Sequence, residues 1–98
     1  MSDLRRLRWA QRALRRLERI KLSIMIDNPA AADRVLERMV TAAQALTTHP
    51  AIGRPGRIVS TRELVLADTP YIVAYRVTAG EVVILTVIHA AQRWPDEL

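Results

Sequence analysis

The sequence predicts an α+β fold in which an N-terminal helical hairpin packs on a three- to four-stranded antiparallel sheet, in the order β-α-α-β-β-β. Two consecutive stretches of the N-terminal half repeat apolar residues at steps of three and four, which is the period of an amphipathic α-helix. The C-terminal half contains short runs of β-branched residues between turn-forming residues, which is typical of strands. A segment rich in glycine and proline separates the two halves.

The first helix is predicted from Ala10 onward. Its apolar positions recur at helical spacing: Ala10, Ala13, Leu14, Leu17, Ile20 and Ile24. Four basic residues have the same spacing but lie about half a turn away from the apolar side: Arg12, Arg15, Arg16 and Arg19. We call these four residues the arginine ridge. Such a ridge is either a solvated helix face or a binding surface for an anionic partner.

The second helix is predicted to begin at Pro29, because proline suits the first turn of a helix and Asn28 can act as the N-cap. The helix is expected to extend to about Thr47, before Thr48-His49-Pro50 ends it. Its apolar positions again follow the helical period: Ala32, Val35, Leu36, Met39, Ala42, Ala43 and Leu46. The short connection between the two helices implies an antiparallel hairpin.

Residues 51–56 contain Gly53-Arg54-Pro55-Gly56 and are followed by Arg57. This composition predicts a loop, which carries Arg54 and Arg57 into solvent. Strands are predicted over residues 58–66, 71–77 and 82–88, joined by turns at residues 67–70 and 78–80. The last strand is apolar on both faces, which indicates that it is central or covered on both sides. Leu4, Leu7 and Trp9 predict a further short strand ahead of the first helix.

The length and the charge narrow the classes of function. Ninety-eight residues predict one domain over residues 1–98, and fifteen basic against ten acidic side chains give a net charge of +5. Fourteen of the fifteen basic residues are arginine, which favours nucleic acid or an acidic protein as partner. No apolar run follows the N-terminal arginines, residues 82–88 are too few to cross a bilayer, and cysteine is absent. We therefore expect a cytoplasmic protein with no membrane partner.

The sequence predicts no metal site and no cofactor. His49 and His89 are far apart in the sequence, and neither an HExxH motif nor an acidic cluster is present. Gly53 and Gly56 lack the lysine and the helix start that a phosphate-binding loop requires.

Taken in this order, several short strings resemble the RelE/ParE toxin family of type II toxin–antitoxin systems, over nearly the whole chain. The strings are Trp9-Ala10, Asn28-Pro29-Ala30-Ala31, Gly53-Arg54-Pro55-Gly56-Arg57, Thr61-Arg62-Glu63-Leu64, Pro70-Tyr71, Ala74-Tyr75-Arg76-Val77 and His89-Ala90-Ala91-Gln92-Arg93-Trp94-Pro95. The resemblance implies a growth-inhibiting toxin that forms a hetero-oligomer with a small cognate antitoxin and reaches operator DNA through it. It also implies one of two targets: the ribosome, where RelE-like members cleave messenger RNA, or DNA gyrase, which ParE-like members inhibit.

Candidate residues exist for both mechanisms. Metal-independent RNA cleavage needs a base, an acid and cations near the phosphate. The catalytic candidates are His89 and Glu63 for proton transfer, with Arg62 and Arg76 for phosphate binding. The candidates for target or nucleic-acid binding are Arg54, Arg57, Arg93 and Trp94, and Tyr71 is a second stacking candidate. The arginine ridge is the candidate antitoxin-binding surface.

Each candidate has a structural alternative. His89 follows the strict alternation of Val83, Leu85 and Val87, so it can be a structural histidine that closes the sheet. Arg62 and Arg76 can pair with Glu63, with Glu81 or with an antitoxin carboxylate. The ring of Trp94 can pack the chain end against the helices.

Comparison with RelE-type nucleases favours the gyrase-directed interpretation. Those nucleases concentrate lysines and arginines along the first long strand of the meander and the start of the next strand, whereas this chain has Glu63-Leu64-Val65-Leu66 and Ile72 there. Inhibition of DNA gyrase is therefore preferred, and a ribosome-dependent endonuclease is the alternative. A second alternative is a non-toxic member that binds only, as a co-repressor with its antitoxin.

Overall fold

The computed structural model describes residues 4–94 and contains two helices and a five-stranded sheet. The elements are β1 (Arg6–Trp9), α1 (Gln11–Asp27), α2 (Pro29–Ala45), β2 (Arg54–Pro55), β3 (Arg62–Val65), β4 (Tyr71–Val77) and β5 (Glu81–His89). The strands lie in the order β1-β5-β4-β3-β2; β1 is parallel to β5 and every other pair is antiparallel. The predicted fold class is confirmed, including the short N-terminal strand. The sheet differs from the prediction in having five strands instead of three or four, and in being mixed instead of wholly antiparallel.

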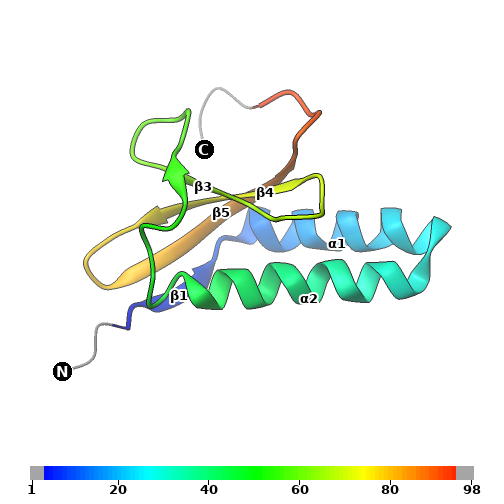
Figure 1. Ribbon diagram of the computed structural model, residues 1–98, viewed down its shortest axis with the longest axis horizontal. Helices are drawn as coiled ribbons and strands as arrows, with labels where there is room; N and C mark the ends of the chain where they lie inside the picture. The colour runs from blue at the N-terminus through cyan, green and yellow to red at the C-terminus, as the bar shows by residue number, and fades with distance from the viewer. Residues whose placement is uncertain (1–3, 95–98) are drawn as a thin grey trace.

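The helical hairpin forms where the apolar period and the capping residues predicted it. The side-chain oxygen of Asn28 accepts a hydrogen bond of 3.2 Å from the backbone N–H of Ala31, and Pro29 occupies the first turn of α2. Figure 1 shows α1 and α2 side by side against one face of the sheet. In the described part of the chain, no helix is long and apolar enough to cross a membrane.

The main core lies between the hairpin and the sheet. Tyr75 and Val73 of β4 pack there with Met39 of α2, and all three side chains are fully buried. Leu7 and Trp9 of β1 are packed against the same cluster. Burying an aliphatic or aromatic side chain of this size stabilises a fold by roughly 1.5–3 kcal/mol, so this cluster fixes the register of β4 and β5 under the helices.

The opposite face of the sheet is also covered. Ile72, Ala74 and Ile88 are buried there, and the strand register places them on the side away from the hairpin. The loop that follows β2 and the segment that follows β5 lie on this side (Figure 1). The prediction that the last strand is covered on both faces is confirmed, since residues 82–85 are all buried.

β3 is shorter than predicted, because the chain turns where a strand was expected. Residues 58–61 form a turn in which the Gly56 N–H donates to the Thr61 carbonyl at 2.7 Å and Ser60 has a φ of 64°. The preceding loop also departs from expectation, since Arg54 and Pro55 pair with β3 as the short strand β2. β2 is therefore the edge strand of the sheet, formed by residues that the sequence pattern predicted to be a loop.

A β-bulge in β5 changes the face on which its end lies. Ala74 is opposite Thr86 while Tyr75 is opposite Ile84, so Leu85 is an extra residue. Beyond the bulge, His89 therefore shares a face with Val87 and Ile84, which belong to the core under the helices. The expected alternation of His89 with Val83 and Leu85 is wrong for this reason.

Candidate functional site

A buried glutamate organises the sheet edge opposite the hairpin. Among residues 4–94, Glu63 is the only charged residue that is buried, with 3% of its surface exposed. Its Oε1 accepts hydrogen bonds from Arg54 Nε at 3.1 Å and Nη2 at 2.9 Å. Its Oε2 accepts the Arg57 backbone N–H at 2.8 Å and Arg57 Nε at 3.4 Å. One carboxylate therefore ties β2 and the following loop to β3.

These contacts keep Glu63 ionised. Burial alone raises the pKa of the carboxyl, but the Arg57 N–H, the Arg54 hydrogen bonds and the charges of both guanidinium groups outweigh burial, and the pKa lies below its ordinary value of 4.5. The negative charge is thus neutralised by two arginines whose outer parts remain about half exposed. Arg54 and Arg57 consequently present their guanidinium groups to solvent in fixed positions.

Arg57 also connects this group to the end of the described chain. The guanidinium carbon of Arg57 lies 3.7 Å from the ring centroid of Trp94, a cation–π geometry. We call Arg54, Arg57, Glu63 and Trp94 the Glu63 cluster. The ring contact that the structure gives Trp94 is therefore with Arg57, and not with the helices as the structural alternative held. Arg93, which precedes Trp94 in the sequence, is exposed.

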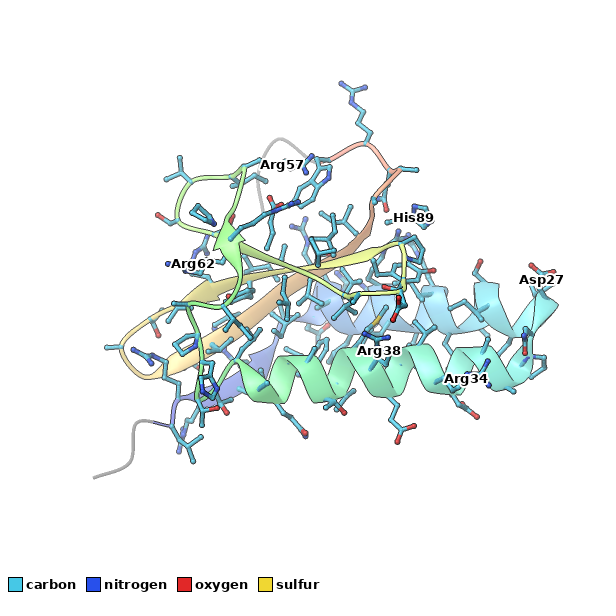
Figure 2. The ribbon with its side chains drawn as sticks, in the orientation of Figure 1. Asp27, Arg34, Arg38, Arg57, Arg62 and His89 are labelled. Atoms are coloured by element: carbon cyan, nitrogen blue, oxygen red, sulfur yellow. The ribbon has the colours of Figure 1, made fainter. Side chains whose placement is uncertain are left out.

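The structure separates His89 from the other predicted catalytic residues, which lie near the opposite end of β4. Arg62 is opposite Tyr75, and its Nη1 donates to the Gly53 carbonyl at 2.7 Å. His89 is opposite Tyr71, four residues away along β4, or about 13 Å at the usual rise per residue. Figure 2 shows Arg62 and His89 at opposite ends of the sheet.

Arg76 and Glu63 do not complete such a site either. Arg76 is opposite Val83, half-buried, and both oxygens of Glu63 accept hydrogen bonds from arginines. The alternative that Arg62 and Arg76 form ion pairs with Glu63 or Glu81 does not match the ion pairs of the structure. The partners of Glu63 are Arg54 and Arg57, and Glu81 pairs with Arg8 at 3.1 Å. The catalytic roles of Arg62, Arg76, Glu63 and His89 stay predictions.

Tyr75 fixes the start of β2 from inside the core. Its hydroxyl donates to the Pro50 carbonyl at 2.7 Å and accepts the Gly53 N–H at 2.9 Å. Burial raises the pKa of this phenol, although the Gly53 N–H and the charge of Arg62 oppose the shift. A Cβ on Gly53 would lie 2.4 Å from the hydroxyl oxygen, so only glycine allows this close approach.

Replacing Tyr75 with phenylalanine should lower the free energy of unfolding by about 2 kcal/mol, because two backbone groups lose their partner inside the protein. Urea denaturation of the purified variant measures this loss. Tyr71→Phe is the matched control, since Tyr71 is only half-buried and contacts His89 through its ring. Equal stability of the Tyr75 variant and the native chain would contradict the proposed anchoring of the loop.

A second group of polar side chains lies on the hairpin side of the sheet, at the ends of β4 and β5. A pocket of about 250 Å³ is lined there by Arg16, Arg19, Ile20, Ser23, Tyr71 and His89. The rings of Tyr71 and His89 meet edge to face, with centroids 5.5 Å apart. Arg16 Nε donates to the Val87 carbonyl at 3.0 Å, which attaches α1 to β5.

The segment after β5 completes this arrangement. Gln92 Oε1 accepts hydrogen bonds from the Arg16 guanidinium and from the His89 N–H. The sequence pattern missed this pocket, because strict alternation along β5 points His89 away from α1. The remaining members of the arginine ridge, Arg12, Arg15 and Arg19, are exposed as predicted. Within residues 4–94, no group of three or more acidic or histidine side chains could hold a metal ion.

Comparison with known proteins places this architecture in a family. The family model described as the ParE toxin of the type II toxin–antitoxin system parDE matches residues 7–94. The chain is 58% identical over 94 residues to the putative toxin Y4kP of Sinorhizobium fredii, covering 96% of this chain and 97% of that protein. It is 39% identical over 84 residues to the toxin RelE2 of Caulobacter vibrioides, covering 86% of this chain and 93% of the relative.

Solved structures share the fold at lower identity. A chain from the chromosomal ParDE system of P. aeruginosa superposes with a TM-score of 0.81 at 24% identity, covering 90% of this chain and 98% of that one. A chain from the RelBE2 toxin–antitoxin complex of Mycobacterium tuberculosis gives a TM-score of 0.60 at 24% identity, covering 94% and 98%. The family match spans both the Glu63 cluster and the pocket beside His89. The chain therefore belongs to the RelE/ParE family of toxins of type II toxin–antitoxin systems.

Proposed function

We propose that this toxin inhibits growth by acting on DNA gyrase and that a cognate antitoxin neutralises it. The observation that supports this target is the Glu63 cluster. Its carboxylate is neutralised by Arg54 and Arg57, and the two guanidinium groups and the Trp94 ring form a fixed basic and aromatic surface. Arginine and tryptophan are the residue types that contribute most often to strong protein–protein contacts.

The same cluster disfavours RNA cleavage. General base catalysis needs a group within hydrogen-bond reach of the proton it removes, with a pKa near the working pH. Both oxygens of Glu63 already accept hydrogen bonds from arginine, and its pKa lies below the ordinary value. His89, the other proton-transfer candidate, lies at the far end of β4 from Arg62.

A RelE-like endonuclease remains the second candidate, and one observation favours it. A relative with 39% identity carries the name toxin RelE2. In that case the exposed guanidinium groups of Arg54, Arg57 and Arg93 would bind the RNA phosphates, because arginine binds phosphate with two parallel hydrogen bonds.

For the antitoxin we propose an acidic segment that binds along the arginine ridge, with operator DNA reached through the antitoxin. Arg12, Arg15 and Arg19 are exposed on one side of α1, and Arg15 makes a 3.4 Å contact with Gln11. Charge complementarity of this kind accelerates association and selects partners.

Induction of the gene in a bacterium, with and without the protein encoded beside it, tests the target. We expect filamentation, induction of the DNA-damage response and loss of negative supercoiling, all relieved by the neighbouring protein. The purified chain should block ATP-dependent supercoiling by purified gyrase.

Codon-positioned cuts in messenger RNA with normal supercoiling would contradict the gyrase target and support the nuclease alternative. Unimpaired growth, combined with operator binding by the toxin–antitoxin complex, would instead support the co-repressor alternative.

A further inference from the structure

The pocket beside His89 has the chemistry of an anion site. Its polar lining residues are Arg16, Arg19, Ser23, Tyr71 and His89, which carry guanidinium, hydroxyl and imidazole groups. All of these groups can donate hydrogen bonds, and no carboxylate lines the pocket. Ile20, which is 3% exposed, supplies the apolar part of the wall.

The donors are partly fixed and partly available. Arg16 is held by the Val87 carbonyl and by Gln92. His89 Nδ1 accepts the Ala91 N–H at 3.1 Å, so the neutral ring carries its proton on Nε2 and donates from there. Within residues 4–94, the side chains of Arg19 and Ser23 have no hydrogen-bond or ion-pair partner. The pocket therefore combines donors that are held in place with donors that are free to bind a ligand, and within this part of the chain it contains no carboxylate that would compete for them.

The surface next to the pocket indicates the kind of molecule that supplies the anion. Arg19, Ser23 and Ile26 follow one another at steps of four and three along α1, so they share one side of the helix. Ile26 is 83% exposed, and Leu22 on the adjoining side is 61% exposed. A nucleic-acid backbone would leave these aliphatic side chains in water, whereas a peptide with acidic and apolar residues would cover them.

We infer that this pocket receives one carboxylate side chain of the antitoxin, and that an apolar residue of the same antitoxin segment packs on Ile26. The inference rests on the proposed pairing with an antitoxin and names the point at which the acidic segment is anchored. A carboxylate can accept two parallel hydrogen bonds from the Arg19 guanidinium, with Ser23 and His89 Nε2 as further donors.

The test measures the affinity of the purified toxin for the full-length protein encoded in the adjacent reading frame. Arg19→Ala should weaken binding by about 30-fold, as expected when one partner of a desolvated ion pair is removed. Ile26→Ala should weaken it by about threefold to tenfold. The matched control is Arg34→Ala, because Arg34 is an exposed arginine on α2 away from the pocket (Figure 2) and should change affinity by less than about threefold.

A double-mutant cycle identifies the ligand. Each acidic residue of the antitoxin is changed to its amide in the native and Arg19→Ala backgrounds, and one of them should lose its effect in the variant. Native affinity of the Arg19→Ala toxin overturns the pocket assignment while leaving the pairing intact. If the neighbouring protein does not bind even the native toxin, the pairing itself fails. If Arg19→Ala weakens binding to a DNA or RNA oligonucleotide but not to the antitoxin, the pocket is a phosphate site and the inference is wrong.

Discussion

Replacing Glu63 with alanine is expected to lower the free energy of unfolding by about 3 kcal/mol at neutral pH. Breaking a buried ion pair costs 3–5 kcal/mol as a rule, and we expect the lower value because the guanidinium groups of Arg54 and Arg57 are about half exposed and can be hydrated. The side chain removed accepts four hydrogen bonds in this structure. Urea denaturation of the purified chain measures the loss.

The effect should depend on pH in a defined direction. The pKa of Glu63 is lowered in the folded state from its ordinary value of 4.5. The ionised carboxylate therefore stabilises the fold above about pH 4.5, and this stabilisation is lost as the pH falls below 4.5 through the folded-state pKa. The difference between the native chain and the Glu63→Ala variant should be largest at neutral pH and should shrink below pH 4.5.

Glu81→Ala is the matched control for this prediction. Glu81 also pairs with an arginine, Arg8, but the two side chains are 36% and 57% exposed. Its removal should cost less than about 1 kcal/mol, because exposed ion pairs contribute little. Equal losses for Glu63→Ala and Glu81→Ala, or a loss at Glu63 that does not change with pH, would contradict the assigned role of the buried carboxylate.

Local signals in the sequence predicted the helices and the central strands. The apolar period and the Asn28-Pro29 cap depend on neighbouring residues only, so α1 and α2 start where expected. β4 was predicted over its full length for the same reason. The start of β3 was predicted too early. Ile58 and Val59 are β-branched, which favours a strand, but the Gly56–Thr61 hydrogen bond and the positive φ of Ser60 turn the chain there.

The candidate site depends on contacts that the sequence pattern does not specify. Glu63 meets Arg54 and Arg57 only because β2 turns back on β3, and local spacing does not reveal that pairing. Likewise, the position of His89 depends on a single extra residue, Leu85, in the pairing of β4 with β5. The ion pairs of Glu63 and Glu81 are therefore made with Arg54, Arg57 and Arg8, and not with Arg62 or Arg76 as the sequence pattern allowed.

Replacing Trp94 with alanine is expected to weaken gyrase inhibition by about 30-fold, if the Glu63 cluster is the target surface. Removal of an aromatic residue at the centre of a protein–protein contact costs about 2 kcal/mol or more, which corresponds to that factor. Trp94 also contacts the Arg57 guanidinium, at 3.7 Å from the ring centroid, so its loss removes one of the two contacts that hold that guanidinium within residues 4–94, the other being with Glu63. The measurement is the toxin concentration that halves supercoiling by purified gyrase.

The Trp94→Phe variant retains an aromatic face for Arg57 and should recover much of the inhibition. Arg38→Ala is the control for a basic surface residue, since Arg38 lies on α2 and pairs with the exposed Asp68 at 3.7 Å (Figure 2).

Measuring the affinity of the Trp94→Ala variant for the antitoxin distinguishes a lost target contact from a disturbed fold, because the arginine ridge lies on α1 and the Glu63 cluster on the opposite face of the sheet. Trp94→Ala should therefore bind the antitoxin with native affinity. Full inhibition of gyrase by Trp94→Ala would show that the target does not bind at the Glu63 cluster. Loss of both gyrase inhibition and antitoxin binding would show that Trp94 has a structural role.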